Sequence, residues 1–331
     1  MNLPPLLRIL LWPLSILYAG AMWLRTSLYA RGWLKQKRLD GRVVSVGNLT
    51  VGGTGKTPMV IWLAERFLAE GKRVAILSRG YRGSGKTSDE IELMKDRLQG
   101  RALFGVGKDR YAEGKRLQRA GVDIFLIDDG FQHLRLARDV DIVLIDSTHP
   151  LRQDSILPAG RLREPRSALH RADLVIFTRT EQSKPMVPAI QKSPQMATYM
   201  STTKLLAFRD HASRTDLLPA CPAPVFAFAG IGNPEAFFAD LERWNVHLVG
   251  SKAFRDHHRY TKRELQELTA AAQSLGAKAL MTTEKDAQNL DAGLLSGMPV
   301  HIAVVAMEIP DEGRFMRDLR ERLALRSGVA A

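Results

Sequence analysis

Residues 50–57 read Thr50, Val51, Gly52, Gly53, Thr54, Gly55, Lys56 and Thr57, and this stretch decides the fold. An apolar run, Arg42–Val46, precedes it, and a stretch with helical periodicity, Pro58–Glu70, follows it. A glycine-rich loop between a strand and a helix, ending in Lys-Thr, is typical of phosphate-binding loops. We therefore expect residues 50–57, here called the phosphate loop, to bind a nucleotide.

The two residues at the end of the phosphate loop have the side chains that this chemistry requires. Lys56 is expected to reach the β- and γ-phosphates, and the Thr57 hydroxyl is expected to ligate Mg²⁺. The general pattern has Gly where this chain has Thr50. The alternative interpretation is a glycine-rich turn with an incidental lysine.

A pair of carboxylates ends a second apolar run. The strand predicted at Asp123–Ile127 is followed by Asp128 and Asp129. Ligands of open parallel sheets lie at the carboxyl ends of the strands, so both acids are expected beside the phosphate loop. An acid in this place holds Mg²⁺ in P-loop proteins. The alternative is a pair of solvated acids.

Apolar runs and amphipathic stretches alternate along most of the chain, which indicates an α/β fold with open, largely parallel sheets. We expect two open α/β/α units, the first a P-loop NTPase-type parallel sheet, after an N-terminal membrane-associating helix. The expected divisions are a membrane-interface segment (1–40), an ATP-binding domain (41–150), a junction loop (151–172) and a second α/β domain (173–331). The last helix could pack on either unit. The predicted strands are Arg42–Val46, Arg73–Ser78, Asp123–Ile127, Asp141–Ile145, Leu174–Phe177, Val225–Ala229, Val246–Val249, Lys278–Thr282 and Val300–Val305, and the predicted helices are Pro58–Glu70, Asp109–Ala120, Pro234–Trp244, Lys262–Leu275 and Glu312–Leu325.

Composition excludes some classes of protein and points to a charged partner. One cysteine, Cys221, in 331 residues excludes an intrachain disulfide and a cysteine-based zinc site. The chain has 48 Lys+Arg against 35 Asp+Glu, a net charge of +13. Residues 1–42 contain seven basic side chains and one acid, which gives 7 − 1 = +6. This excess indicates an anionic partner: nucleic acid, a membrane surface or a phosphorylated substrate.

An uncharged stretch, Ile9–Leu24, lies inside this basic segment. Its 16 residues would span about 24 Å as a helix, less than the ~30 Å of a bilayer core. With Trp12, Tyr18 and Trp23 it is typical of a helix that lies in the membrane interface. Two alternatives are a signal peptide cleaved near Ala19-Gly20-Ala21 and a buried core helix.

Several motifs together resemble one family, tetraacyldisaccharide 4′-kinase, the lipid A 4′-kinase. The resemblance covers nearly the whole chain, and its motifs occur in the family's order. They are Ser-Val-Gly-Asn-Leu-Thr-Val-Gly-Gly-Thr-Gly-Lys-Thr-Pro (45–58), Ser-Arg-Gly-Tyr (78–81), Asp-Asp-Gly-Phe-Gln-His (128–133), Leu-Pro-Ala-Gly-Arg-Leu-Arg-Glu (157–164), Ala-Gly-Ile-Gly-Asn-Pro (229–234), Phe-Arg-Asp-His-His-Arg-Tyr (254–260) and Thr-Glu-Lys-Asp-Ala (283–287).

The resemblance implies transfer of the γ-phosphate of ATP, with Mg²⁺, to the 4′-hydroxyl of an acylated glucosamine disaccharide 1-phosphate. The product would be lipid IV-A. It also implies a peripheral enzyme on the cytoplasmic face of a bacterial inner membrane, and we expect it to act as a monomer on an anionic membrane surface, without nucleic acid.

The resemblance also implies site residues. The counterpart of the family's catalytic Asp is Asp89, and its partner His is His257; a family acid near the metal corresponds to Glu164. Lys56 completes the catalytic set, and Thr57, Asp128, Asp129 and Glu164 form the expected metal set. Arg161, Arg163 and Arg166 are candidates for contact with phosphate. The motif Thr283–Asp286 has no role that the sequence reveals.

Three rival functions remain at this point. The first is a membrane-docked, deviant P-loop ATPase that acts on a protein partner. The second is a non-enzymatic membrane scaffold with a relic nucleotide site, and intact Lys56, Thr57 and Asp128 count against it. The third is a nucleic-acid binder, which would need basic patches interleaved with aromatic residues.

Overall fold

The computed structural model describes residues 4–80, 88–149, 151, 154–185, 196–217, 223–290 and 297–325. Tyr81 of the Ser-Arg-Gly-Tyr motif and Cys221 lie outside these residues. The described chain forms two compact units. The first contains the described parts of residues 1–83, 98–202 and 309–331, and the second those of 84–97 and 203–308.

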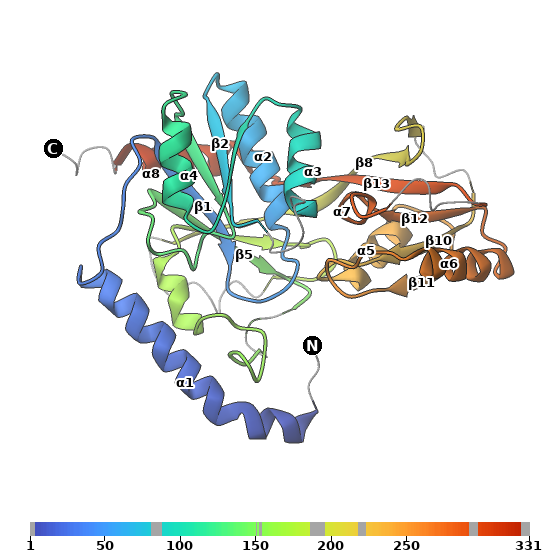
Figure 1. The fold of residues 1–331 in the computed structure, drawn as a ribbon, viewed down its shortest axis with the longest axis horizontal. Helices are drawn as coiled ribbons and strands as arrows, with labels where there is room; N and C mark the ends of the chain where they lie inside the picture. The colour runs from blue at the N-terminus through green and yellow to red at the C-terminus, as the bar shows by residue number, and fades with distance from the viewer. Residues whose placement is uncertain are drawn as a thin grey trace. The chain divides into compact units, whose positions relative to one another are not determined.

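A seven-stranded parallel sheet is the centre of the first unit (Figure 1). Its strand order is β3-β2-β4-β1-β5-β6-β7. The central strands are buried along nearly their whole length, as expected where both faces of a parallel sheet are covered. In chain order the strands are β1 (Arg42–Asn48), β2 (Val74–Ser78), β3 (Leu103–Val106), β4 (Ile124–Asp128), β5 (Val140–Asp146), β6 (Leu174–Thr178) and β7 (Ala197–Met200).

Helices complete the first unit. Leu117 of α4 packs with Val43, Leu77 and Phe125 of the sheet in one apolar cluster. Trp62 of α2 meets Phe315 of α8 edge to face, with 5.6 Å between ring centroids. The helices are α1 (Pro5–Ala30), α2 (Lys56–Ala69), α4 (Arg110–Gln118), α8 (Glu312–Leu325) and a short 3-10 helix, Arg166–Arg171.

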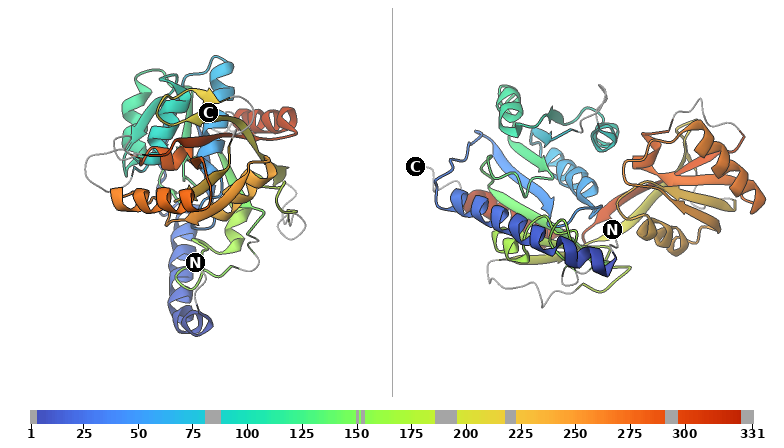
Figure 2. Two further views of the ribbon diagram at one scale, coloured as in Figure 1. Left: turned by 90° about the vertical axis from the view of Figure 1, so that its right-hand side faces the viewer. Right: turned by 60° about the horizontal axis from the view of Figure 1, so that its bottom comes forward.

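The N-terminal helix α1 is longer than the sequence led us to expect (Figure 2). Its 26 residues extend about 39 Å, because the helix continues through Arg8 and Arg25 at the two ends of the uncharged stretch. By length and composition alone, Leu6–Ala30 could cross a membrane. The prediction that this segment is too short for a membrane span is therefore wrong.

One narrow stripe of α1 packs on the first unit. The Ser15 hydroxyl donates to the carbonyl of Ile156 at 3.1 Å, and the Tyr18 hydroxyl donates to the carbonyl of Arg163 at 3.0 Å. Most apolar side chains of α1 are exposed, with Leu10 at 73% and Leu17 at 71%. The alternative of a buried core helix is therefore excluded.

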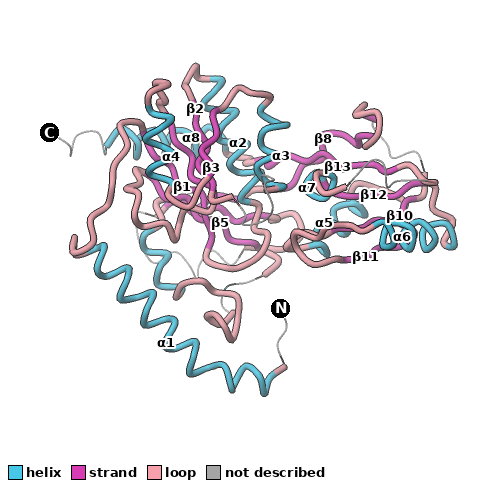
Figure 3. The backbone as a smooth tube through the Cα atoms, in the orientation of Figure 1, coloured by secondary structure: helices cyan, strands magenta, loops and turns pink. Residues whose placement is uncertain are grey.

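The second unit contains a six-stranded sheet, whose strands are magenta in Figure 3, with order β11-β10-β12-β13-β8-β9. Alternate residues of β10 contact different helices: Val225 and Ala227 pack with α5, and Phe226 and Phe228 pack with α6. The two helices therefore cover opposite faces of the sheet. The elements are α3 (Asp89–Leu98), β8 (Thr202–Asp210), β9 (Asp216–Leu217), β10 (Val225–Ala229), α5 (Pro234–Arg243), β11 (Leu248–Ala253), α6 (Lys262–Ser274), β12 (Ala279–Thr283), α7 (Glu284–Ala287) and β13 (Val300–Glu308).

The structure confirms the two α/β units but divides the chain elsewhere. The strand β6, predicted to begin the second domain, pairs in parallel with β5 and belongs to the first sheet. The stretch 151–172 is therefore part of the first unit and not a junction between domains. The last helix, α8, also belongs to the first unit.

The helix α3 was not predicted, and it belongs to the second unit although it lies between β2 and β3 in the chain. Its Arg97 forms an ion pair with Glu284 of α7 at 2.9 Å, and both side chains are largely buried. This contact explains why α3 associates with the second sheet, and so why Asp89 does too.

Candidate active site

The phosphate loop has the backbone that anion binding requires. Gly52 and Gly55 have φ values of 118° and 86°, in the region that glycine adopts without strain. The helix α2 begins at Lys56, and its N-cap residue Gly55 provides no side chain to cap it. The amide groups of the first turn are thus available to an anionic ligand.

The segment 161–163 runs antiparallel beside the phosphate loop. The amide of Val51 donates to the carbonyl of Arg161 at 2.8 Å, and the amide of Arg163 donates to the carbonyl of Leu49 at 2.7 Å. Thr50, the residue that departs from the general pattern, is buried in a bridge with Leu162. The Leu-Pro-Ala-Gly-Arg-Leu-Arg-Glu motif is therefore a structural partner of the loop.

Asp129 lies between two cations next to the phosphate loop. Its carboxylate is 3.6 Å from Lys56 Nζ and 2.7 Å from a guanidinium nitrogen of Arg163. Burial raises the pKa of Asp129, but the charges of Lys56 and Arg163 outweigh burial and bring the pKa below its ordinary value. The expected position of this acid beside the loop is confirmed.

The other two expected metal ligands have different partners. Asp128 is buried, and its Oδ2 accepts from the hydroxyl of Ser78 on β2 at 3.2 Å. Glu164 is buried against Arg171 at 2.6 Å. Within the part of the chain that the structure describes, these carboxylates and Asp129 do not form one group of three ligand atoms.

The three arginines of 161–166 do not form one cluster. Arg161 pairs with Asp154 at 2.9 Å, whereas Arg163 pairs with Asp129. Arg166 donates to the carbonyl of Asp154 at 3.0 Å. The side chain of Arg163 thus contacts another candidate site residue.

Two residues at the end of β6 hold the phosphate loop and were missed as site residues. Arg179 donates to the carbonyl of Gly53 at 3.1 Å and pairs with Asp146 at 2.6 Å. The Thr178 hydroxyl donates to the carbonyl of Thr54 at 3.2 Å. Both residues lie at the end of a buried strand, and this position could have marked them as site residues. The sequence, however, led us to place the strand Leu174–Phe177 in the second domain.

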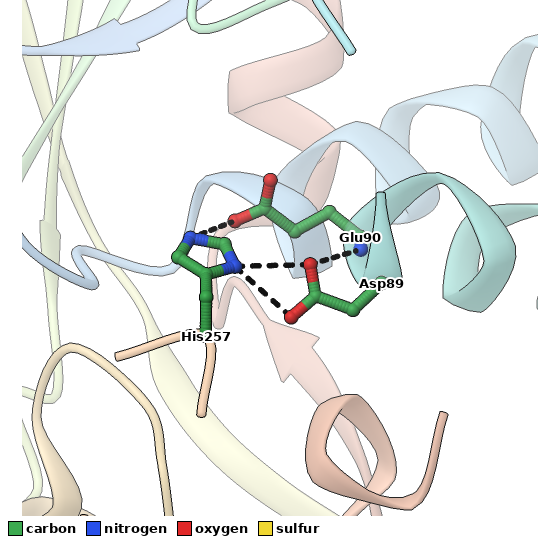
Figure 4. Close-up of side chains that lie close together, drawn as sticks. All are labelled: Asp89, Glu90 and His257. Carbon is green, nitrogen blue, oxygen red and sulfur yellow. Dashed lines mark hydrogen bonds and ion pairs between the residues drawn. The ribbon is translucent and has the colours of Figure 1, made fainter. Parts of the chain in front are cut away.

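A second group of residues gathers in the second unit around Asp89, the first residue of α3 (Figure 4). His257, which is 168 positions away, places its Nδ1 3.0 Å from each carboxylate oxygen of Asp89. The pair that the family resemblance implied is thus in hydrogen-bond contact.

His257 has an unusual backbone for a residue other than glycine. Its φ is 60°, in the left-handed region that costs roughly 1–2 kcal/mol for L-residues. Its amide donates to the carbonyl of Gly230 at 3.0 Å. Conformations of this kind persist only where the surroundings enforce them, and they are frequent at functional sites.

Each member of the pair favours the charged form of the other. Burial raises the pKa of Asp89, but the hydrogen bond from His257 and the charge of Lys285 lower it, and the net pKa lies below its ordinary value. The hydrogen bond to Asp89 raises the pKa of His257, although burial and Lys285 oppose this. The Asp89 carboxylate is therefore ionised at neutral pH.

The motif Thr283–Asp286 organises the second unit around this pair. The Thr283 side chain caps α7, and Glu284 pairs with Arg97 of α3. The buried Asp286 accepts from the amide of Gly230 at 2.9 Å and from the Tyr260 hydroxyl at 2.8 Å. The backbone that holds His257 is therefore attached to this motif.

Asp89, Glu90 and His257 have the spacing of a possible metal site, with ligand atoms within 4.8 Å of one another. The ammonium of Lys285 lies 3.2 Å from Glu90 and 3.9 Å from Asp89. A cation already occupies the position that a metal ion would need, so we assign no metal to this group.

Comparisons with known proteins agree with this architecture. The family model for tetraacyldisaccharide-1-P 4'-kinase matches residues 7–324. A tetraacyldisaccharide 4'-kinase from Geobacter metallireducens is 42% identical over 322 residues, which cover 91% of this chain and 94% of that protein. One from Geobacter sulfurreducens is 41% identical, over 88% of this chain and 87% of that protein.

A solved structure resembles the whole chain. The crystal structure of the "apo" form of LpxK from Aquifex aeolicus in complex with ATP matches with a TM-score of 0.74 and 30% identity. The match covers 96% of this chain and 99% of that one.

Proposed function

The chain belongs to the tetraacyldisaccharide-1-P 4'-kinase family, and on that basis we propose that it transfers the γ-phosphate of ATP to the 4′-hydroxyl of an acylated glucosamine disaccharide 1-phosphate. The product is lipid IV-A, an intermediate of lipid A biosynthesis. The family match along nearly the whole chain carries this proposal, and the contact between His257 and Asp89 supports the chemistry.

The first unit binds ATP in this proposal. Residues 50–57 cradle the phosphates, and the uncapped N-terminus of α2 adds its partial positive charge. Lys56 stabilises charge that develops on the β- and γ-phosphates. Arg163 pairs with Asp129, which lies beside Lys56, and Arg179 donates to the carbonyl of Gly53 in the loop.

The residues present also fit Mg²⁺. The Thr57 hydroxyl and the carboxylates of Asp128, Asp129 and Glu164 are hard oxygen ligands, the type that Mg²⁺ prefers. Mg²⁺ is commonly held by one or two carboxylates together with phosphates and waters, so a closed protein cage is not required. When bound, it neutralises charge on the transferring phosphate.

The second unit supplies the base. A sugar hydroxyl loses its proton as the new P–O bond forms, and the Asp89 carboxylate accepts that proton. The Nδ1 of His257 orients the carboxylate by contacting both of its oxygens. The bond from the γ-phosphorus to the bridging oxygen breaks as ADP leaves.

We also propose that α1 binds the enzyme to the cytoplasmic face of the inner membrane, where its lipid substrate lies. Ser15, Tyr18 and Arg25 attach one side of α1 to the first unit through hydrogen bonds. A helix fixed to protein along one side suits the membrane interface, with its remaining apolar side chains in the acyl region. The basic residues around it attract anionic lipid.

The alternative, a membrane-docked ATPase that acts on a protein partner, is not favoured. Such a protein would need the phosphate loop and the acidic strand end. It would have no use for a buried carboxylate and an imidazole paired as in Asp89 and His257.

Incubation with γ-labelled ATP, Mg²⁺ and the acylated disaccharide 1-phosphate in detergent tests the proposal. We expect label in the lipid, and none when the 4′-hydroxyl is replaced by hydrogen. Release of label as inorganic phosphate at the same rate with and without lipid would contradict a kinase and favour the ATPase.

A further inference from the structure

Lys285 is the cation at the centre of the group around Asp89. Its Nζ lies 2.9 Å from Asp256 Oδ1, 3.2 Å from Glu90 Oε1 and 3.9 Å from Asp89 Oδ2. It also lies 3.5 Å from Nε2 of His257. Its side chain is 17% exposed, so these contacts are largely removed from solvent.

The groups around this ammonium come from three separate segments. Asp89 and Glu90 begin α3, Asp256 and His257 lie in the loop after β11, and Lys285 belongs to α7. The neutral amide of Asn289 donates to Asp89 Oδ2 at 3.3 Å. The one ammonium group of Lys285 thus connects α7 with both α3 and this loop.

Without Lys285, the carboxylates of Asp89, Glu90 and Asp256 would face one another. Among the described residues that contact them, His257 would be the remaining group that can carry a positive charge. Like charges in a partly buried site raise the pKa of a carboxyl group and favour its protonated form. The pKa of Asp89 would then be higher, and a smaller fraction of the carboxylate would be ionised at acidic pH. The carboxylates of Glu90, Asp256 and Asp89 raise the pKa of Lys285 itself against the effect of burial, so the ammonium stays charged throughout the physiological range.

We propose that Lys285 is a positioning residue for the transfer step: its ammonium attaches the Asp89 carboxylate to α7 and screens it from Glu90 and Asp256. The inference rests on the proposed role of Asp89 as the base. It gives a function to the one side chain of the Thr283–Asp286 motif that had none. Thr283 caps α7, Glu284 pairs with Arg97 of α3, and Asp286 accepts from the amide of Gly230 and from the Tyr260 hydroxyl.

The test compares three variants of the full-length protein in detergent. Lys285→Met removes the charge, and Lys285→Arg keeps it. Lys204→Met is the matched control, because Lys204 forms an exposed ion pair with Glu308 in the same unit. Should Lys285→Met not fold, Lys285→Gln takes its place. Each variant is measured for ATP binding, for the pH profile of kcat/KM in phosphoryl transfer, and for the pKa of His257 by NMR with labelled histidine, assigned by its loss in His257→Asn.

We expect Lys285→Met to bind ATP normally and to lower kcat by about 10²-fold, as misplaced reacting groups do. The acid limb of kcat/KM should move to higher pH by about one unit, because an opposite charge near Asp89 has been removed. The pKa of His257 should rise, since Lys285 opposes its protonation. Lys285→Arg should restore much of each value.

Two results would overturn the inference. One is that Lys285→Met and Lys204→Met have the same pH profile of kcat/KM and the same pKa of His257. The other is equal impairment of Lys285→Met and Lys285→Arg with no change in the His257 pKa, which is the behaviour of a purely structural residue. Failure of the proposed function is distinguishable, because the wild-type protein would then put no label in the lipid. Failure of the base role alone would appear as transfer by Asp89→Asn at the wild-type rate.

Discussion

A carboxylate whose pKa lies below its ordinary value is a weak base, and Asp89 is such a carboxylate. Phosphoryl transfer tolerates this, because its transition state is loose and bond formation to the nucleophile lags behind bond breaking. The hydroxyl of the sugar therefore becomes acidic late in the reaction, after the bond to ADP has largely broken. For this step, a fixed and ionised proton acceptor is more effective than a stronger base that is partly protonated. The contacts of Asp89 with His257 and Lys285 provide that acceptor.

Replacing Asp89 with Asn should separate binding from chemistry. The amide keeps the shape of the side chain but cannot accept the proton, so turnover should fall by about 10²–10⁴-fold. ATP affinity should stay within about twofold, because in this proposal the residues that hold the phosphates are those of the phosphate loop and not Asp89. Asp96→Asn, an exposed acid on the same helix, is the matched control. Parallel losses of turnover and ATP affinity in Asp89→Asn would remove Asp89 from the base role.

The contact between His257 and Asp89 should make stability depend on pH. The pKa of His257 is raised above its ordinary 6.5. Its contribution to the free energy of unfolding is therefore complete below pH 6.5 and is lost as pH rises through the pKa that His257 has in the folded protein. The pKa of Asp89 is lowered from 3.8, so its contribution is present above 3.8 and is lost as pH falls through the folded value.

The difference in melting temperature between the wild type and His257→Asn should thus be largest between pH 3.8 and 6.5. It should narrow as pH rises above 6.5 through the raised pKa of His257 in the folded protein. His247→Asn, an exposed histidine of the same unit, should show no such trend. A difference that stays constant or widens above pH 7 would contradict the ion pair.

At the scale of elements, the turn after β10 is the support of His257. A Cβ on Gly230 would lie 2.9 Å from the Cβ of His258 and 3.0 Å from both the Arg255 carbonyl and Asp286 Oδ1. Gly230→Ala should therefore displace the loop and lower the free energy of unfolding by about 1–3 kcal/mol.

Turnover of Gly230→Ala should fall more than ATP binding, because the loop carries His257. Gly313→Ala is the control, since a Cβ there meets nothing within 4 Å. Wild-type turnover and stability in Gly230→Ala, measured by transfer assay and urea unfolding, would show that the loop adapts and does not constrain His257.

The helix α1 should bind membranes through its exposed face. The double variant Leu10→Glu/Leu17→Glu places two charges on that face and should release the protein from vesicles containing anionic lipid. Leu275→Glu, an exposed leucine of the second unit, should leave binding unchanged. Co-sedimentation measures both. Undiminished vesicle binding by the double variant would assign membrane contact to another surface.

The elements that the sequence predicted well are those with one strong signal. Strands such as β4 and β5 are continuous apolar runs and are buried along their length. Most positions of the strand β8 are exposed or half-buried, and α3 consists mainly of charged residues. Both were missed, because Glu284, the partner of Arg97 in α3, and β13, a neighbour of β8 in the sheet, lie far away in the chain, and a local pattern does not reveal them.

At the scale of the whole molecule, the chain passes between its two units more than once. The helix α3 leaves the first unit, and α8 returns to it after β13. Sequence order suggested one boundary near 151–172, whereas the contacts of Arg97 and the pairing of β6 with β5 decide otherwise. Such long-range contacts depend on complementary side chains that no local periodicity records.

The candidate site was predictable where a motif has a known chemistry. The phosphate loop, the acids at the end of β4 and the pair Asp89 and His257 were expected before the fold was known, the pair through family resemblance. Arg179 and Lys285 were not assigned a role, because each acts through neighbours that are remote in sequence.

The central claim concerns one bond, between the γ-phosphate of ATP and the 4′-oxygen of the lipid. The most direct measurement is ³¹P NMR of the lipid formed by the wild-type protein from ATP, Mg²⁺ and the acylated disaccharide 1-phosphate. The account predicts one new phosphate monoester, coupled to the proton at the 4′ carbon, beside the unchanged 1-phosphate. A new phosphate on any other oxygen, or a diphosphate at position 1, would contradict it.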